Sequence, residues 1–180
     1  MSLAKRNNDI RLREKPKDVF ITPRDLALKH INIVNEKSKE DDVWIDPCRY
    51  NEGGSYYSQI PTEKKDWCEI TEGRDFFEYE DHVDIVIQNP PYSMITKWIA
   101  KCISLNPRII SLLIGVNNLT AKRIETFNKA GYGITHLTML KVRQWFGETY
   151  IVVFEKDKSN IINIDRKQYY MVVEKKEEDK

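Results

Sequence analysis

The chain has 180 residues, of which 41% are hydrophobic and 11% aromatic, so it can bury a core of its own and is not an intrinsically disordered chain. No apolar run approaches the roughly 20 residues that span a bilayer, and the N-terminal sequence lacks the apolar stretch of a secretory signal. The three cysteines are far apart, which suits a reducing compartment and favours neither a disulfide framework nor a zinc site. We therefore expect a cytoplasmic, intracellular protein with no membrane partner and no metal.

The formal net charge of +1 conceals two halves of opposite sign. Residues 40–84 carry fourteen acidic and four basic side chains, whereas residues 85–148 carry eight basic and two acidic ones. A basic half indicates a polyanionic partner, although folding can also mix these charges into an ordinary solvated surface. Residues 1–18 form a basic arm, which is either a contact for phosphate groups or a disordered tail. The basic residues of the arm are Lys5, Arg6, Arg11, Arg13, Lys15 and Lys17.

The first part of the chain predicts a helix, a short strand and a turn. The helix covers 22–34, with Thr22 as its N-cap because a proline follows at the first helical position. An apolar run over 43–46 ends in an acid and a proline, which indicates a buried strand followed by a Gly- and Tyr-rich loop. Residues 67–77 bracket a turn around Gly73.

The second part alternates strands and helices and ends in a small hairpin. In chain order the predicted elements are a strand over 83–88, a helix over 94–105, a strand over 109–114, a helix over 118–130, strands over 134–141 and 150–155, and a hairpin of 161–164 with 169–173. Strands separated by helices, with all-apolar central strands, predict an α/β fold with a mainly parallel central sheet and a C-terminal antiparallel strand pair. In such sheets ligands bind beyond the carboxyl ends of the strands, so we expect the loop after Asp46 and the segment after Gln88 to meet.

That segment, Asn89-Pro90-Pro91-Tyr92, is the most informative part of the sequence. Its two prolines remove two backbone donors and leave carbonyl oxygens free to accept hydrogen bonds. The Asn89 amide can accept and donate, and Tyr92 supplies a flat face for stacking. This combination predicts a receptor for a planar NH2 group, such as the exocyclic amine of a base or a carboxamide. The alternative is a strand terminator with an incidental Asn cap.

The same tetrapeptide resembles the catalytic motif of the amino-group S-adenosylmethionine-dependent methyltransferases, and it is most similar to their DNA adenine-N6 type. The resemblance covers about residues 20–155. It implies a Rossmann-like methyltransferase fold, S-adenosyl-L-methionine as the cofactor, and a catalytic role for Asn89, Pro90, Pro91 and Tyr92. On this basis we expect the arm over 1–18, a methyltransferase-like domain over 19–156, and a C-terminal extension over 157–180 with the hairpin and a charged tail.

Other segments resemble the family's cofactor motifs in matching order. Phe-Ile-Thr-Pro over 20–23 resembles the element that packs against the methionine moiety, and Asp-Pro-Cys over 46–48 resembles the start of the DP-x-x-G-x-G loop. The glycines of that loop arrive late here, after Arg49-Tyr50-Asn51-Glu52, so Gly53 is expected to replace them. Glu69 lies where the family has its acidic residue for the ribose, and Asp66 is the alternative for this role. Asp75 and Phe76 resemble the pair that flanks the adenine ring. The implied cofactor residues are Phe20, Thr22, Pro23, Asp46, Pro47, Gly53, Glu69, Asp75 and Phe76.

Aromatic and basic side chains lie together in the loop between the last two predicted strands of the domain. Lys141, Arg143, Trp145 and Phe146 combine charges for phosphate with rings for bases, which is typical of a nucleic-acid contact. The alternative is a hairpin tip folded onto the edge of the sheet. The three histidines share no metal-ligand spacing.

These features lead to one main functional hypothesis and two alternatives. The main one is a small adenine-N6 DNA methyltransferase, with DNA as its partner and a sequence specificity that is either weak or supplied by a further partner. The first alternative keeps the fold and cofactor but methylates an RNA base or a protein glutamine amide. The second is a catalytically decayed nucleic-acid-binding module on the same scaffold. The compact size resembles that of phage- or virus-encoded members of the family.

Overall fold

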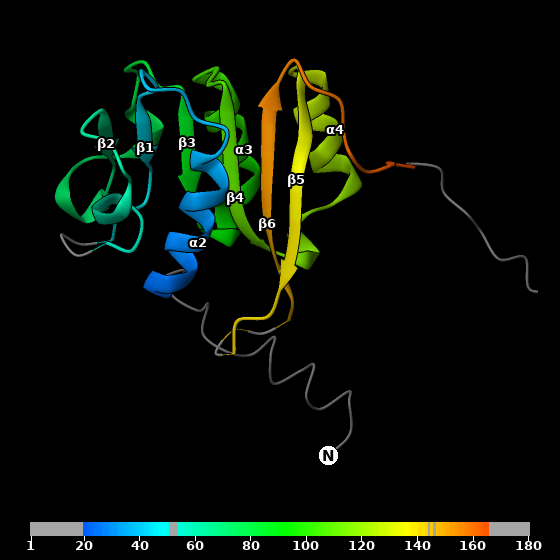
Figure 1. Ribbon diagram of the computed structural model, residues 1–180, viewed down its shortest axis with the longest axis horizontal. Coiled ribbons are helices and arrows are strands. Elements are labelled where there is room, and N and C mark those ends of the chain that lie inside the picture. The colour runs from blue at the N-terminus through cyan, green and yellow to red at the C-terminus, as the bar shows by residue number, and fades with distance from the viewer. Residues whose placement is uncertain (1–19, 51–53, 144, 146, 166–180) are drawn as a thin grey trace, which may run out of the picture.

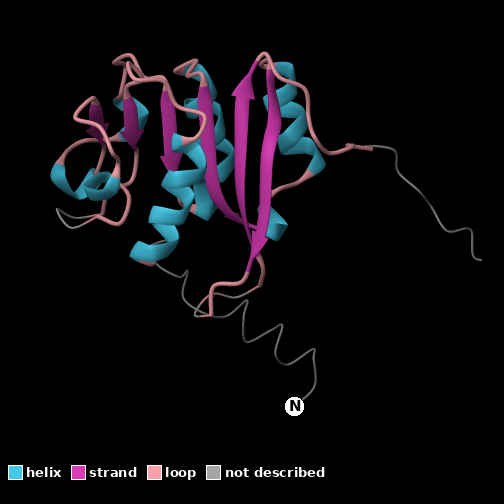
Figure 2. Cartoon of the chain, in the orientation of Figure 1, coloured by secondary structure: helices cyan, strands magenta, loops and turns pink. Residues whose placement is uncertain are grey.

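The computed structural model describes residues 20–50, 54–143, 145 and 147–165, and these form a six-stranded sheet with helices on both faces (Figures 1 and 2). The basic arm and the second strand of the terminal hairpin lie outside the described residues. In chain order the strands are β1 (Trp44–Asp46), β2 (Lys65–Trp67), β3 (Ile85–Gln88), β4 (Ile109–Gly115), β5 (Tyr132–Leu140) and β6 (Thr149–Lys156). The α-helices are α2 (Arg24–Asn35), α3 (Ile95–Ser104) and α4 (Ala121–Lys129).

The strand order across the sheet is β2-β1-β3-β4-β6-β5. The pairs β1–β2, β1–β3 and β3–β4 are parallel, whereas β6 runs antiparallel to both of its neighbours. The prediction of a mainly parallel sheet with a C-terminal antiparallel strand pair is therefore confirmed. β3 and β4 are buried over nearly their whole length because helices cover both faces, which explains their unbroken apolar sequences.

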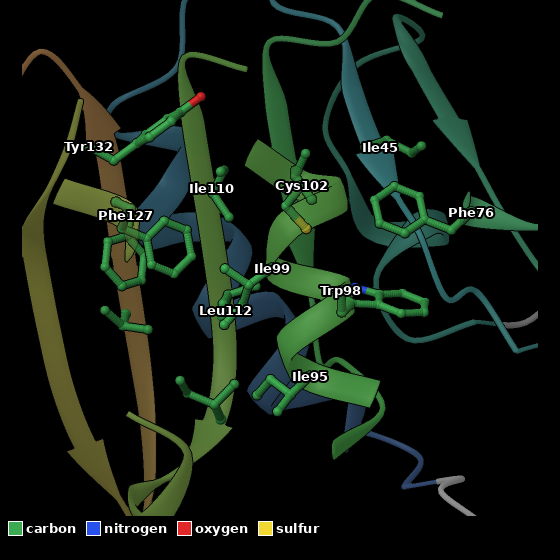
Figure 3. Packing of buried hydrophobic residues seen from close by; sticks show 14 of the residues in the cluster. Ile45, Phe76, Ile95, Trp98, Ile99, Cys102, Ile110, Leu112, Phe127 and Tyr132 are labelled. Carbon is green, nitrogen blue, oxygen red and sulfur yellow. The ribbon is translucent and has the colours of Figure 1, made fainter. Parts of the chain in front are cut away.

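Each face of the sheet carries its own apolar core. On one face α2 packs Ala27, Ile31 and Val34 against the sheet, and on the other face lie α3 and α4 (Figure 1). Figure 3 shows the second core, where Trp98 of α3 packs against Phe76 with ring centroids 4.9 Å apart. Phe127 of α4 stacks on Phe154 of β6 at 3.8 Å.

Two helix starts differ from the sequence prediction. α2 begins at Arg24 with Pro23 in the N-cap position and no side-chain cap, so the prediction of Thr22 as N-cap is wrong. The physical reason is that the Thr22 side chain is buried and its hydroxyl hydrogen bonds to Tyr56 instead. α4 begins at Ala121, because a 3-10 turn precedes it and Thr120 caps it by accepting from Arg123 N–H.

The first strand of the predicted terminal hairpin is also absent, since residues 161–164 form bends and coil. This stretch crosses the start of β5, where Ile161 N–H donates to the Ile134 carbonyl at 2.9 Å. Gly133 is required at the crossing, because a Cβ there would lie 2.2 Å from the Lys158 carbonyl oxygen. Residues 157–165, the described part of the C-terminal extension, therefore cover part of the sheet's edge as an irregular segment.

The two strands that follow β1 in the sequence lie on opposite sides of it in the sheet. β2 follows β1 on one side, and β3 returns to pair with β1 on the other. A reversal of this kind leaves a crevice at the carboxyl ends of the two strands, and this is where open α/β sheets bind ligands. Short 3-10 turns follow the carboxyl ends of the strands: η1 (Tyr57–Gln59) in the loop after β1, η2 (Ile70–Glu72) after β2, η4 (Tyr92–Met94) after β3 and η5 (Val116–Asn118) after β4. The fifth turn, η3 (Phe76–Glu78), packs against α3 through Phe76. Within the described residues, no helix is long and apolar enough to cross a membrane.

Candidate active site

The carboxyl ends of three neighbouring strands bring the predicted polar residues to one edge of the sheet. Asp46 ends β1, Glu69 follows β2 by two residues, and Asn89 follows β3 directly. Parallel pairing of β1 with both neighbours places these three ends side by side. The sequence-based expectation that the Asp46 loop and the Asn89 segment meet is consistent with this topology.

Asp46 is a buried carboxyl, 1% exposed. Its Oδ1 accepts from Cys48 N–H at 3.2 Å and its Oδ2 accepts from Tyr57 N–H at 3.1 Å. Desolvation raises the pKa of Asp46 to about 7, although these two donors and Arg49 act in the opposite direction. At neutral pH the carboxyl is therefore close to its midpoint, and a cation bound beside it would favour the charged form.

Glu69 is 8% exposed and joins the loop after β1 to the loop after β2. Its Oε2 accepts from Tyr50 N–H at 2.8 Å, while its Oε1 accepts from the Thr71 N–H at 3.0 Å and hydroxyl at 2.7 Å. A carboxylate offers about four acceptor positions, so these three bonds leave about one for a ligand hydroxyl. Asp66, the alternative acid, lies within β2 and pairs with Arg74 at 2.6 Å.

At position 50, the loop after β1 has a backbone conformation typical of glycine, although the residue is tyrosine. Tyr50 has φ 75°, in the left-handed region that favours glycine, and lies where the resemblance places the loop's first glycine. The neighbouring Arg49 guanidinium lies 3.5 Å from the Trp67 ring centroid and pairs with Glu72 at 2.7 Å. The Arg49 Nε is buried without a hydrogen-bond partner among the described residues. Gly53, expected to replace the missing glycines, lies outside the described residues.

Asn89 presents one satisfied and one unsatisfied end of its side chain. Its Nδ2 donates to the Phe20 carbonyl at 3.1 Å, which fixes the amide orientation. Its Oδ1 is buried and has no hydrogen-bond partner within the described part of the chain. Such an acceptor costs about 1–3 kcal/mol when it is left unpaired, so it is the natural destination for an N–H donor of a ligand. Pro90, next in the chain, is buried, and Pro91 is half-buried.

Tyr92 is held by contacts on both its hydroxyl and its ring. The hydroxyl accepts from Gly115 N–H at 2.8 Å, at the carboxyl end of β4. The ring stacks on Phe20 with centroids 6.2 Å apart, and Phe20 in turn meets Trp145 edge-on at 6.3 Å. The Phe20 ring lies against Tyr92 and is 45% exposed, and its predicted contact with a cofactor stays a prediction.

The remaining predicted cofactor residues lie around the same loops with unequal exposure. Thr22 and Pro47 are buried, Pro23 is half-buried at the start of α2, and Asp75 accepts from Phe77 N–H at 2.9 Å as the cap of η3. Phe76 is 2% exposed and packs on Trp98 in the core, so little of its ring is available to a ligand.

The predicted nucleic-acid contacts lie in the loop between β5 and β6. Trp145 is half-buried against Phe20, whereas Lys141 and Arg143 are exposed. The Lys141 ammonium donates to the Gly147 carbonyl at 2.8 Å. Phe146 lies outside the described residues. Among the described residues, no group of three or more His, Cys, Asp and Glu side chains is arranged to hold a metal ion.

Several groups of the site are backbone atoms that no sequence motif identified. They are the Tyr57 N–H on Asp46, the Phe20 carbonyl on Asn89 and the Gly115 N–H on Tyr92. Backbone N–H and C=O groups exist at nearly every residue, so only the fold determines which of them reach the site.

Comparison with known proteins supports the fold assignment. No protein-family model and no curated protein matches the chain. Among solved structures, a "putative RNA methyltransferase" from Pyrococcus horikoshii is 14% identical with a TM-score of 0.55, over 87% of this chain and 98% of that one. Magnesium protoporphyrin IX methyltransferase from Synechocystis, with bound S-adenosylmethionine, is 12% identical with a TM-score of 0.53, over 74% and 79% of the two chains.

A third solved structure shows the same likeness. It is a "putative class I S-adenosylmethionine-dependent methyltransferase" from Listeria monocytogenes, 11% identical with a TM-score of 0.59, over 86% of this chain and 66% of that one. At such low identities the shared property is the fold. The chain therefore has the Rossmann-like fold of S-adenosylmethionine-dependent methyltransferases.

Proposed function

We propose that the protein is an S-adenosylmethionine-dependent methyltransferase that methylates the N6 amino group of adenine in DNA. The observation that carries the proposal is the buried, unpaired Oδ1 of Asn89, oriented by the Phe20 carbonyl and followed by two prolines and a stacking tyrosine. This arrangement accepts hydrogen bonds from a planar NH2 group while holding the plane of its ring system. The exocyclic amine of adenine has these properties.

The residues at the edge of the sheet fit the proposed cofactor. Asp46 is a buried carboxyl that a neighbouring cation would hold in its charged form, and Glu69 retains about one acceptor position for a hydroxyl. Asp46 and Glu69 would hold the cationic and ribose parts of S-adenosylmethionine, with Thr22, Pro23, Pro47, Gly53, Asp75 and Phe76 around them. When bound, the cofactor supplies an activated methyl group on a sulfonium.

The protein's own contribution is positioning and fixed polarity. Asn89 Oδ1 and the Pro90 carbonyl would accept from the two hydrogens of the target amine and direct its lone pair toward the methyl group. Tyr92, locked by Gly115 N–H, would stack on the base after it has left the duplex. Lys141, Arg143, Trp145 and Phe146 would contact the surrounding phosphates and bases.

Two other functions remain as alternatives for the same site. RNA is the second substrate to test, because the Pyrococcus horikoshii structure, which matches over nearly its full length, is described as a "putative RNA methyltransferase". A protein glutamine amide also presents a planar NH2 group. The third reading, a decayed nucleic-acid-binding module, is motivated by Tyr50 in the glycine position of the loop.

The deciding experiment compares S-adenosylhomocysteine binding by calorimetry with labelled-methyl transfer to unmethylated DNA, RNA and glutamine-containing peptide. We expect binding that Asp46→Ala weakens, and methyl transfer to DNA. Transfer to RNA or peptide alone would assign one of the alternative substrates, and the absence of any binding would favour the decayed module.

Asn89→Ala tests the catalytic assignment, with Asn32→Ala on the exposed side of α2 as the matched control. We expect Asn89→Ala to abolish methyl transfer, because it removes the acceptor for the amine. The substitution also removes the donor on the Phe20 carbonyl, but none of the Asp46 or Glu69 contacts, so S-adenosylhomocysteine affinity should stay nearly unchanged. Asn32→Ala should change neither. Equal loss of binding and transfer in Asn89→Ala would show that Asn89 acts elsewhere than at the target amine.

A further inference from the structure

A chain of buried hydrogen bonds runs from the start of α2 to the middle of the sheet. The Tyr56 hydroxyl lies 3.0 Å from His30 Nδ1, and His30 Nε2 lies 2.6 Å from Ser111 Oγ. Ser111 Oγ donates to the Val152 carbonyl at 3.3 Å, and Thr22 hydrogen bonds to Tyr56 from the other end. His30 and Ser111 are 0% exposed and Tyr56 is 5% exposed.

The donors and acceptors of this chain have one consistent direction. Because Ser111 gives its proton to Val152, it accepts from Nε2–H of His30. His30 Nδ1 is then the acceptor for the Tyr56 hydroxyl, whose oxygen accepts from Thr22. Burial, together with the nearby His136, lowers the pKa of His30 to about 3, so the ring is neutral as this pattern requires.

Tyr56, at the outer end of these hydrogen bonds, belongs to the segment 54–60. This segment contacts Asp46 directly and the start of α2, which leads to Asn89. Tyr57, next to Tyr56, donates its N–H to Asp46 at 3.1 Å. The same segment is tied to the start of α2, where Gln59 Nε2 donates to the Arg24 carbonyl at 3.0 Å and Ser55 Oγ donates to the Thr22 carbonyl. Two residues before Thr22, the Phe20 carbonyl orients Asn89.

We propose that His30 and Tyr56 are positioning residues, which anchor the segment 54–60 and the start of α2 to β4 so that Tyr57 N–H stays on Asp46 and the Phe20 carbonyl stays on Asn89. The placement itself rests only on the contacts described, whereas its effect on catalysis rests on the proposed function. If His30, Tyr56 and Ser111 only filled space in the core, they would need no polar groups. Apolar side chains of similar size would pack in the same space without buried donors to satisfy.

The consequence for Asp46 can be measured without any ligand. Asp46 is surrounded by the Cys48 and Tyr57 N–H groups, the Arg49 guanidinium, the Glu69 carboxylate and the Tyr56 ring. The Tyr57 donor lowers the pKa of Asp46, so moving it away should raise that pKa further. Arg49 and Glu69 are held by other contacts and stay in place.

Tyr56→Phe removes one hydroxyl from the chain and keeps the ring. Tyr132→Phe is the matched control, because Tyr132 is equally buried and its hydroxyl donates to the Pro107 carbonyl at 2.7 Å, at the opposite edge of the sheet. Carbon-13 NMR titration of the Asp46 carboxyl in the cofactor-free protein reports the pKa directly. We expect Tyr56→Phe to move the Asp46 midpoint to higher pH and to weaken S-adenosylhomocysteine binding about tenfold, and Tyr132→Phe to do neither.

An unchanged Asp46 midpoint in Tyr56→Phe, or the same shift in both variants, would overturn the proposal. If Tyr56→Phe does not fold, Ser111→Ala interrupts the chain at its inner end and is read in the same way. Failure of the wild-type protein to bind S-adenosylhomocysteine would contradict the proposed function, while the NMR titration would still decide the positioning role.

Discussion

At residue 50 a tyrosine occupies backbone space that favours glycine, and its peptide N–H is fixed by Glu69. The left-handed conformation costs a residue with a Cβ about 1–2 kcal/mol. Three consecutive N–H groups, of Cys48, Arg49 and Tyr50, all have acceptors within the loops, so the conformation is set by its surroundings. The backbone at position 50 is therefore held in a conformation typical of glycine, although the residue there is tyrosine.

This strain gives a prediction for a single substitution. Tyr50→Gly should raise the free energy of unfolding by about 1 kcal/mol, because glycine adopts φ 75° without steric cost. Cys48→Gly is the control, since Cys48 is exposed and has no positive φ, and there glycine should lower stability by about 0.5–1 kcal/mol. Urea denaturation of both variants checks the difference. A destabilised Tyr50→Gly would show that the side chain stabilises the loop by more than the strain costs.

At the scale of the elements, the candidate catalytic motif over 89–92 joins β3 to α3, and buried hydrogen bonds of Gln88 fix the two elements to each other. Gln88 is 0% exposed, and its Oε1 accepts from Trp98 Nε1 at 2.6 Å while its Nε2 donates to Cys102 Sγ at 3.4 Å. Gln88 is the residue before Asn89, so the angle at which α3 leaves the strand is set one residue from the site.

Trp98→Phe should therefore destabilise the protein by about 1–3 kcal/mol, because it leaves Gln88 Oε1 buried without a donor. Trp145→Phe, in the loop between β5 and β6, should change the free energy of unfolding by less than about 0.5 kcal/mol. Denaturant midpoints at constant m-value measure both. Equal effects of the two substitutions would mean that the Gln88 contact contributes nothing specific.

At the scale of the whole molecule, two buried groups oppose each other in the pH dependence of stability. The pKa of His30 is lowered from 6.5 to about 3, so only the unfolded state takes up this proton below pH 6.5 and stability falls with acidification. The pKa of Asp46 is raised from 3.8 to about 7, so the folded state keeps a proton that the unfolded state releases, and stability rises with acidification over this range.

Because these pH ranges overlap, the effects of His30 and Asp46 on the free energy of unfolding cancel between about pH 4 and pH 6.5. Asp46→Asn removes one of them, so its free energy of unfolding should fall with acidification more steeply than that of the wild type, by up to about 1.4 kcal/mol per pH unit. His30→Phe should show the opposite difference in slope. Parallel stability curves for the three proteins would show that neither pKa is displaced.

The sequence supports the sheet and the location of the site, but it does not reveal their long-range contacts. The apolar runs of β3 and β4 are local patterns, and the strands that they predict are confirmed. The role of the motif after Gln88 stays a prediction. The Thr22 hydroxyl was assigned to a cap because its partner Tyr56 lies 34 positions further along the chain. The bond from Asn89 to the Phe20 carbonyl was not predicted, because nothing local links two residues that are separated by 69 positions. Contacts of this length depend on the folded chain.

The position of β6 has a consequence for the order in which the chain assembles. β6 is the last strand of the described part of the chain to be synthesised, yet it lies between β4 and β5, and among the described residues β5 pairs only with β6. The ribosome adds about 5–20 residues per second, and β5 cannot pair with its neighbour in the sheet until residues 149–156, which form β6, have emerged. The aromatic loop that meets Phe20 joins these two strands, so the nascent chain completes its candidate active site only after nearly its whole described length has been translated.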